Sequence, residues 1–199
     1  MSHASLRVIR EEYAALAAML RSLQLMVERR PKKNVENFLS VLRAMLFYVD
    51  EFPERLHHTK DTALLFSKAA PVSLHAAGAV KKLDRDHARG EAAVRELQHL
   101  LLAWELVGET RRGAYEGACL RDVSFYLDHM QLEESVILPE AEPWLSPEEW
   151  QQLDDAFASN RDPMFGTYPA DPAYQRLFAN IVLKARHPLA SARTPDHGG

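Results

Sequence analysis

Four long runs of residues with helical hydrophobic spacing constrain the fold of this 199-residue chain more than any other feature. Within each run, apolar residues recur three to four positions apart, which is typical of a helix with one buried face. The runs cover residues 5–29, 34–67, 72–107 and a fourth stretch that contains Cys119 and Ile137. Because short links join them, we predict an all-α, up-down-up-down four-helix bundle.

Prolines and glycines indicate where these helices bend or end. Pro53 lies inside the second run, so we predict one long helix that is kinked or interrupted there. Gly108 is expected to cap the end of the third helix. Pro139 is expected to close the fourth.

The chain changes character after the fourth run. A Ser-Pro pair predicts a short helix over residues 147–159, and the periodicity predicts a last amphipathic helix over 172–186. We therefore divide the chain into a bundle over residues 1–145, a helical extension packed on it over 146–187, and a flexible tail over 188–199.

Composition excludes several classes of protein. The net charge is −4 and no basic run with interleaved aromatic residues occurs, so we expect no nucleic-acid partner. No 18-residue apolar run and no signal-peptide core are present, which predicts no membrane association and a cytoplasmic location. Cys119 is the single cysteine, which excludes an internal disulfide and a cysteine-based metal cluster.

Two histidines each have a carboxylate four residues later in a helical run: His57 with Asp61, and His129 with Glu133. Four residues make about one helical turn, so each pair projects from one face of its helix. Both pairs fall on or beside the apolar stripe and should point inward. A helix can offer two ligands to one metal centre in this way.

The other two helices supply matching single donors. Tyr13 precedes His57 by 44 residues, and His87 precedes His129 by 42. The chain therefore contains two similar helix pairs, each with one donor followed by a donor and a carboxylate four residues apart. This duplication is what a dinuclear metal site with pseudo-twofold symmetry requires.

Each of these side chains alone has an ordinary explanation as a surface residue or a satisfied interior residue. Burying them together without a cation would cost several kcal/mol for each unpaired charge, and a metal removes that penalty. We expect the remaining histidines to lie on the surface: His3, His75, His99, His187 and His197. We expect the tryptophans to be packing anchors: Trp104, Trp144 and Trp150.

Residues 9–16, 48–66, 83–91 and 129–139 together carry a family resemblance, which extends over about residues 6–165. On these segments the sequence resembles the hemerythrin-like, HHE cation-binding domains. The resemblance implies iron in a four-helix bundle. It also implies a ligand set of three histidines and two bridging carboxylates: His57, His87, His129, Asp61 and Glu133.

Two positions depart from the family pattern. Asp61 stands where the family usually has glutamate, and Tyr13 stands where the first helix normally provides a histidine. Tyr13 either binds ferric iron as a phenolate or only fills the space, and the sequence leaves both readings open. Two further candidates lie nearby: Glu91, more readily a partner that orients an imidazole, and His58, expected to face outward or to cap the site.

The function predicted from these residues is non-haem iron binding at a histidine and carboxylate site. We expect two iron ions per chain, or one if Tyr13 does not bind. The expected ligand is dioxygen, nitric oxide or peroxide, and binding or sensing is favoured over catalysis, with peroxide turnover left open. The alternative is a helical interaction module that has lost its metal, suggested by Tyr13 and Asp61.

Overall fold

The computed structural model describes residues 3–29, 35–160, 162, 164 and 174. Within these residues all regular secondary structure is helical. The four long helices of the bundle are α1 (Ala4–Arg29), α2 (Val35–Val49), α5 (Leu74–Val107) and α6 (Arg112–Leu132). Two of them continue directly into shorter helical segments.

The helix that begins as α2 continues as η1 (Asp50–His57), α3 (His58–Lys60), η2 (Asp61–Phe66) and α4 (Ser67–Ala69). The helix that begins as α6, after the short 3₁₀ turn η3 (Glu109–Arg111), continues as η4 (Glu133–Ile137) and α7 (Leu138–Ala141). Segments η1, η2 and η4 are π-helical, with wider turns than an α-helix.

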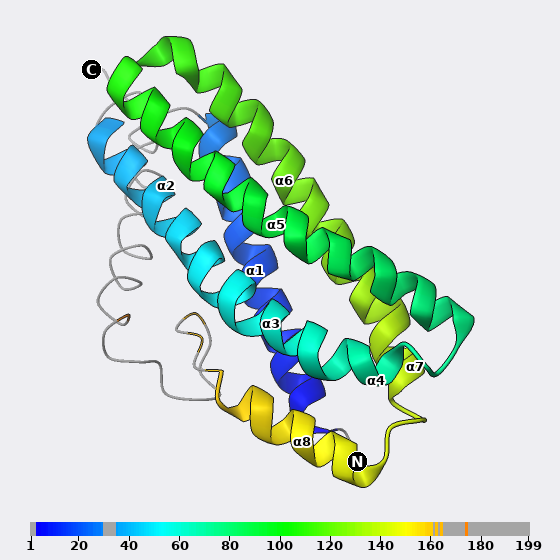
Figure 1. Cartoon of the computed structure of the whole chain (residues 1–199). Helices are drawn as coiled ribbons and strands as arrows, with labels where there is room; N and C mark the ends of the chain where they lie inside the picture. The colour runs from blue at the N-terminus through cyan, green and yellow to red at the C-terminus, as the bar shows by residue number, and fades with distance from the viewer. Residues whose placement is uncertain (1–2, 30–34, 161, 163, 165–173, 175–199) are drawn as a thin grey trace, which may run out of the picture.

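The long helices run antiparallel to their sequence neighbours and lie side by side (Figure 1). Helix α1 contacts both α2 and α6, and α5 contacts both α2 and α6. This is the predicted all-α bundle, with up-down-up-down connections. Its centre is filled by apolar side chains from all four helices, among them Leu23, Leu42, Val94 and Val123.

Of the predicted helix break at Pro53 and the predicted helix ends at Gly108 and Pro139, the first two are confirmed. Pro53 lies inside the π-helical segment η1, where the regular α pattern of the second helix stops. Gly108 caps α5 with a φ of 94°, a left-handed conformation that glycine adopts without a Cβ penalty. Pro139 does not close the fourth helix, which continues to Ala141. The π segment just before Pro139 changes the hydrogen-bond register, and a proline is tolerated near such a change.

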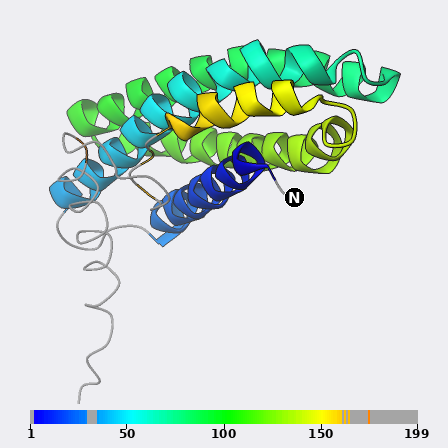
Figure 2. The same ribbon diagram turned by 90° about the horizontal axis from the view of Figure 1, so that it is seen from below.

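A further helix, α8 (Pro147–Ala158), follows the bundle and packs along α1 (Figure 2). Ser146 caps it as predicted, accepting a hydrogen bond from the backbone of Glu149 and returning one to the Glu149 side chain. Trp104 and Trp150 are buried, but Trp144 is 71% exposed, so its prediction as a packing anchor is wrong. It lies in the link between α7 and α8, outside the buried faces of the bundle helices.

The predicted helix over 172–186 and the tail over 188–199 lie outside the described residues, apart from Tyr174. Within the described part of the chain, no helix is long and apolar enough to cross a membrane. The cytoplasmic location stays a prediction.

Candidate metal centre

The π-helical segments set the direction of the polar side chains inside the bundle. His57 is the last residue of η1, Asp61 is the first of η2, and Glu133 is the first of η4. A π turn shifts the side-chain register relative to an α-helix, and such turns occur frequently at functional sites. These three interior donors therefore lie where the helical register changes, whereas His87 and His129 lie within the α-helices α5 and α6.

His57, Asp61 and Glu133 form a first group of donors, which we call the carboxylate group. Their exposed fractions are 4%, 0% and 0%. The His57 Nε2 atom lies 2.8 Å from Asp61 Oδ2, but the two are not aligned as a hydrogen bond. Two donors of one octahedral cation, each about 2.1 Å from it, lie about 3 Å apart. The separation thus suits a shared cation.

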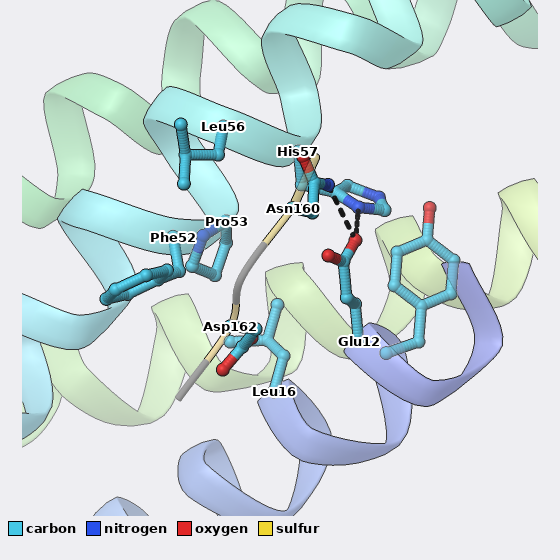
Figure 3. A pocket seen from close by; sticks show the side chains of 9 residues that line it. Glu12, Leu16, Phe52, Pro53, Leu56, His57, Asn160 and Asp162 are labelled. Atoms are coloured by element: carbon cyan, nitrogen blue, oxygen red, sulfur yellow. Dashed lines mark hydrogen bonds and ion pairs between the residues drawn. The ribbon is translucent and has the colours of Figure 1, made fainter. Parts of the chain in front are cut away.

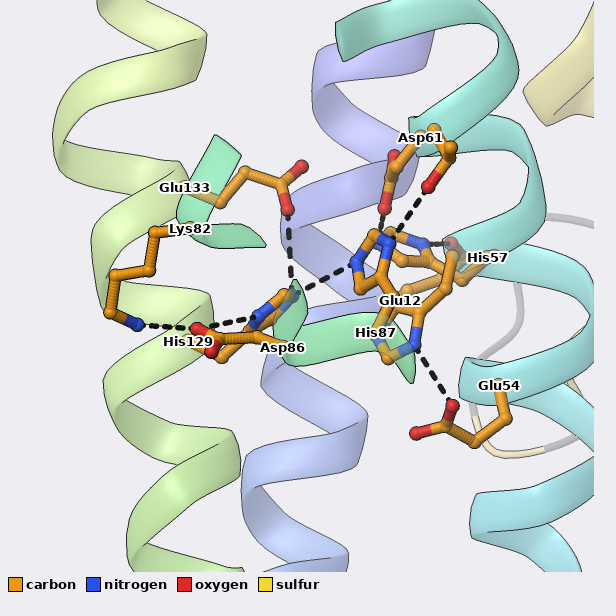
Figure 4. Close-up of polar contacts among 11 residues, drawn as sticks. Glu12, Glu54, His57, Asp61, Lys82, Asp86, His87, His129 and Glu133 are labelled. Atoms are coloured by element: carbon orange, nitrogen blue, oxygen red, sulfur yellow. Dashed lines mark hydrogen bonds and ion pairs between the residues drawn. The ribbon is translucent and has the colours of Figure 1, made fainter. Parts of the chain in front are cut away.

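His58, His87 and His129 form a second group, the imidazole group, in which the donor atoms lie within 4.8 Å of one another. The Nε2 atoms of His87 and His129 face each other at 3.2 Å. Glu133 adjoins this group too, because its Oε2 atom lies 3.9 Å from His129 Nε2. The two groups are therefore neighbours, and their side chains converge from different helices (Figure 4).

Each of the four interior histidines has an oxygen of another side chain near its Nδ1 atom. The distances are 2.6 Å to Glu12 for His57, 3.3 Å to Glu54 for His58, 2.9 Å to Thr62 for His87 and 3.8 Å to Asp86 for His129. Metal-binding imidazoles are commonly oriented by such a partner on the ring nitrogen that does not bind the metal. The contacts of His57 and His87 are hydrogen bonds, whereas His58 Nδ1 and His129 Nδ1 have no aligned partner, so the arrangement suits ligation through Nε2 at His57 and His87.

Burial shifts the protonation of the carboxylate group. It raises the pKa of Glu133 to about 8, with a further contribution from the nearby charge of Asp61. Burial alone would lower the pKa of His57, but Asp61 and Glu12 outweigh it and raise that pKa well above its usual value. Burial also raises the pKa of Asp61, with His57 opposing the shift. Without a cation, this group retains protons at neutral pH.

The imidazole group behaves in the opposite way. Burial, followed by the charge of neighbouring histidines, lowers the pKa values of His87 and His129 to about 2. The same two causes lower the pKa of His58 well below its usual value. All three rings are therefore neutral at physiological pH and keep a nitrogen lone pair, as metal ligation requires.

Tyr13 lies against the carboxylate group. Its side chain is 4% exposed, and its ring centre is 4.9 Å from that of His57. The hydroxyl lacks a well-aligned hydrogen-bond partner, although Glu133 is close enough to contribute to raising its pKa. Burial and the nearby acids raise the pKa of Tyr13 well above 10, so the phenol is neutral without a cation.

Several buried polar atoms inside the bundle lack an aligned hydrogen-bond partner. These atoms include both carboxylate oxygens of Asp61, both of Glu133, the Tyr13 hydroxyl and His57 Nε2. A buried polar group without a partner is rare and costly. These atoms gather at one place in the bundle, and their chemistry of imidazole and carboxylate fits a divalent first-row metal.

All six predicted site residues, Tyr13, His57, Asp61, His87, His129 and Glu133, lie in or beside the two groups. Their roles as ligands stay predictions. The reading of His58 as facing outward is wrong: it is 5% exposed and belongs to the imidazole group. Glu91 points outward and pairs with Arg95, so it orients no imidazole. Cys119 is buried on α6 and belongs to neither group.

The sequence reasoning missed the partners of the histidine Nδ1 atoms. Glu54 stands four residues before His58, a spacing that could have indicated the pair. Glu12 is adjacent to Tyr13, and nothing in its sequence position indicated that it would contact His57. Of the predicted surface histidines, His75 and His99 are exposed, His3 is partly covered by stacking on Trp150, and the other two lie outside the described residues.

No curated protein matches the sequence. Residues 4–141 match the family described as the hemerythrin HHE cation-binding domain, and this stretch holds the bundle and both donor groups. The chain therefore belongs to the hemerythrin HHE cation-binding domain family.

Proposed function

We propose that this protein binds two iron ions inside the bundle, one at each donor group, and through them binds or senses a small ligand. The observation that carries the proposal is the set of buried, unpartnered donor atoms in the carboxylate group. Retaining such atoms without a cation would cost several kcal/mol for each unpaired charge. A cation replaces the retained protons and removes this cost.

The residues divide between two positions. His58, His87 and His129 would hold one ion, and His57 with Asp61 would hold the other. Glu133 would be shared, because it belongs to the carboxylate group and also lies near His129. Tyr13 is an additional candidate ligand for the carboxylate position.

Iron, when bound, would supply a redox-active centre able to bind dioxygen, nitric oxide or peroxide. The protein's own residues would orient the ligands and exclude water. A pocket beside His57 and Tyr13 has no more room than a single water molecule needs, and Leu16, Phe52 and Leu56 form its apolar part (Figure 3). Glu12 and Asn160 also line this pocket, so it borders the partner of the His57 Nδ1 atom.

A helical interaction module without metal is the alternative, and the presence of Tyr13 instead of a histidine is the observation that favours it. Elemental analysis after anaerobic loading with ferrous iron separates the two functions. We expect about two irons per chain. A chain that takes up no iron, cobalt or zinc would leave only the interaction module.

Variants of two adjacent histidines test the assignment of donors to positions. His57→Ala and His58→Ala remove ligands from different groups, so each should reduce the metal content to about one ion per chain. His75→Ala is the matched control, because His75 is exposed and pairs with Glu140 away from both groups. Full metal content in His58→Ala would contradict the imidazole position.

A further inference from the structure

The segment that follows α8 is tied to the stretch that carries His57 and Asp61. Lys60 lies between those two residues, and its ammonium group donates to three acceptors at the end of α8. These are the Ala156 carbonyl at 2.9 Å, Ser159 Oγ at 2.7 Å and the Asn160 side-chain carbonyl. An ammonium has three N–H donors, so this end of the extension uses all of them.

Asn160 continues the contact inward. Its side chain is buried, with 3% exposed, and its Nδ2 atom donates to Glu12 Oε2 at 3.2 Å (Figure 3). The orientation of the amide follows from its neighbours, since Lys60 is only a donor and the Glu12 carboxylate only an acceptor. The same Glu12 oxygen accepts from His57 Nδ1 at 2.6 Å. A continuous path thus runs from Lys60 through Asn160 and Glu12 to His57.

Glu12 needs this second contact to hold one position. A glutamate side chain has three rotatable bonds, and the bond to His57 alone leaves the carboxylate free to rotate about it. Asn160 gives the same oxygen a second hydrogen bond, and the pocket beside it leaves little space for another arrangement. The His57 ring then has its Nδ1 atom fixed toward Glu12 and its Nε2 atom fixed toward Asp61.

We propose that Asn160 is a positioning residue of the metal centre, acting through Glu12 to hold the His57 ring in the orientation that suits metal ligation. The consequence for the metal rests on the proposed function, whereas the orientation of the ring does not. Asn160 lies beyond the residues that match the family, 4–141. The extension of this chain thereby contributes to the centre without providing a ligand.

The test compares two variants of neighbouring residues. Asn160→Asp keeps the size of the side chain and its acceptor for Lys60 but removes the donor to Glu12. Asn160→Ala removes both the acceptor for Lys60 and the donor to Glu12. It replaces the aspartate variant in the test if that variant folds poorly. Ser159→Ala is the matched control, because it removes one contact of Lys60 and leaves the bond to Glu12 intact.

Two measurements are made on the parent chain and on each variant. The first is an NMR spectrum of the metal-free protein with ¹⁵N-labelled histidines, which records the ring nitrogen signals and the Nδ1 proton signals. The signals that His57→Ala lacks are those of His57. The second is cobalt(II) titration followed by its visible absorption spectrum. We expect the Asn160 variants to shift or broaden the His57 signals alone and to weaken cobalt binding by about tenfold or more, with Ser159→Ala close to the parent.

Unchanged His57 signals in both Asn160 variants, or the same change in Ser159→Ala, would overturn the positioning role. Failure of the parent protein to bind cobalt would instead count against the proposed function. The NMR comparison on metal-free protein still decides the orientation of His57 in that case, so the two failures are distinguishable.

Discussion

Metal binding at neutral pH should release about two protons from the carboxylate group. With a pKa of about 8, Glu133 holds about 0.9 proton at pH 7. The His57 and Asp61 pair holds about one more, because the pKa of His57 is raised well above its usual value. The histidines of the imidazole group release none, since all three have lowered pKa values. Glu54, with a pKa of about 7, can add up to about half a proton if a nearby cation ionises it.

Isothermal titration with cobalt(II) in buffers of different ionisation enthalpy measures this number. Release of two protons also makes the apparent affinity rise about 100-fold for each pH unit near neutrality. Tyr13 is neutral without a cation, so ligation as a phenolate adds one proton. The difference between the parent and Tyr13→Phe is then one proton if Tyr13 is a ligand and zero if it fills space.

A release of less than one proton at pH 7 would refute the reasoning, because the donors would then already be in their metal-binding protonation states. Repeating the titration at pH 9.5 provides an internal control. There Glu133 is ionised before the metal arrives, so the measured release should fall by about one proton.

Two further predictions concern the metal-free protein and the environment of Glu54. Gly90→Ala should lower the stability of the metal-free protein by about 1–3 kcal/mol in thermal unfolding. A Cβ at this position would lie 2.7 Å from a Glu54 oxygen and 3.1 Å from the Tyr126 hydroxyl. Gly78→Ala on the same helix has open space and should be neutral or slightly stabilising, so equal losses in both variants would contradict the steric argument.

The stability of the metal-free protein should also fall by roughly 2 kcal/mol between pH 6.5 and 8. Glu133 and Glu54 have raised pKa values in the folded state, so their contribution is present at low pH and is lost as pH rises through about 7 and 8. Denaturant unfolding measures this, and metal-loaded protein should lack the fall.

The sequence determined the bundle because its signal is local. Apolar residues at helical spacing predict each long helix, and short links make neighbouring helices antiparallel. The same periodicity placed His57, Asp61, His129 and Glu133 on buried faces, because a residue four positions from a buried one shares its face. The identity of the polar residues then predicted a metal.

The tertiary structure decided which residues meet, and His58 is the clearest case. Neighbouring residues on a regular α-helix point about 100° apart, so a helix that directs His57 inward should turn His58 aside. The π-helical segment that ends at His57 changes this register. It lets His57 face Asp61 while His58 faces His87 and His129.

The partners of the histidines depend on contacts between segments far apart in the chain. Glu12 and Asn160 are 148 residues apart, yet Asn160 donates to the same Glu12 oxygen that contacts the ring of His57. Hydrophobic spacing carries no information about such a pair, because each member satisfies the local pattern of its own segment. The sequence by itself therefore determined the helices and the kind of site they enclose. How the site is held depends on tertiary packing, because the contact between Asn160 and Glu12 joins segments far apart in the sequence.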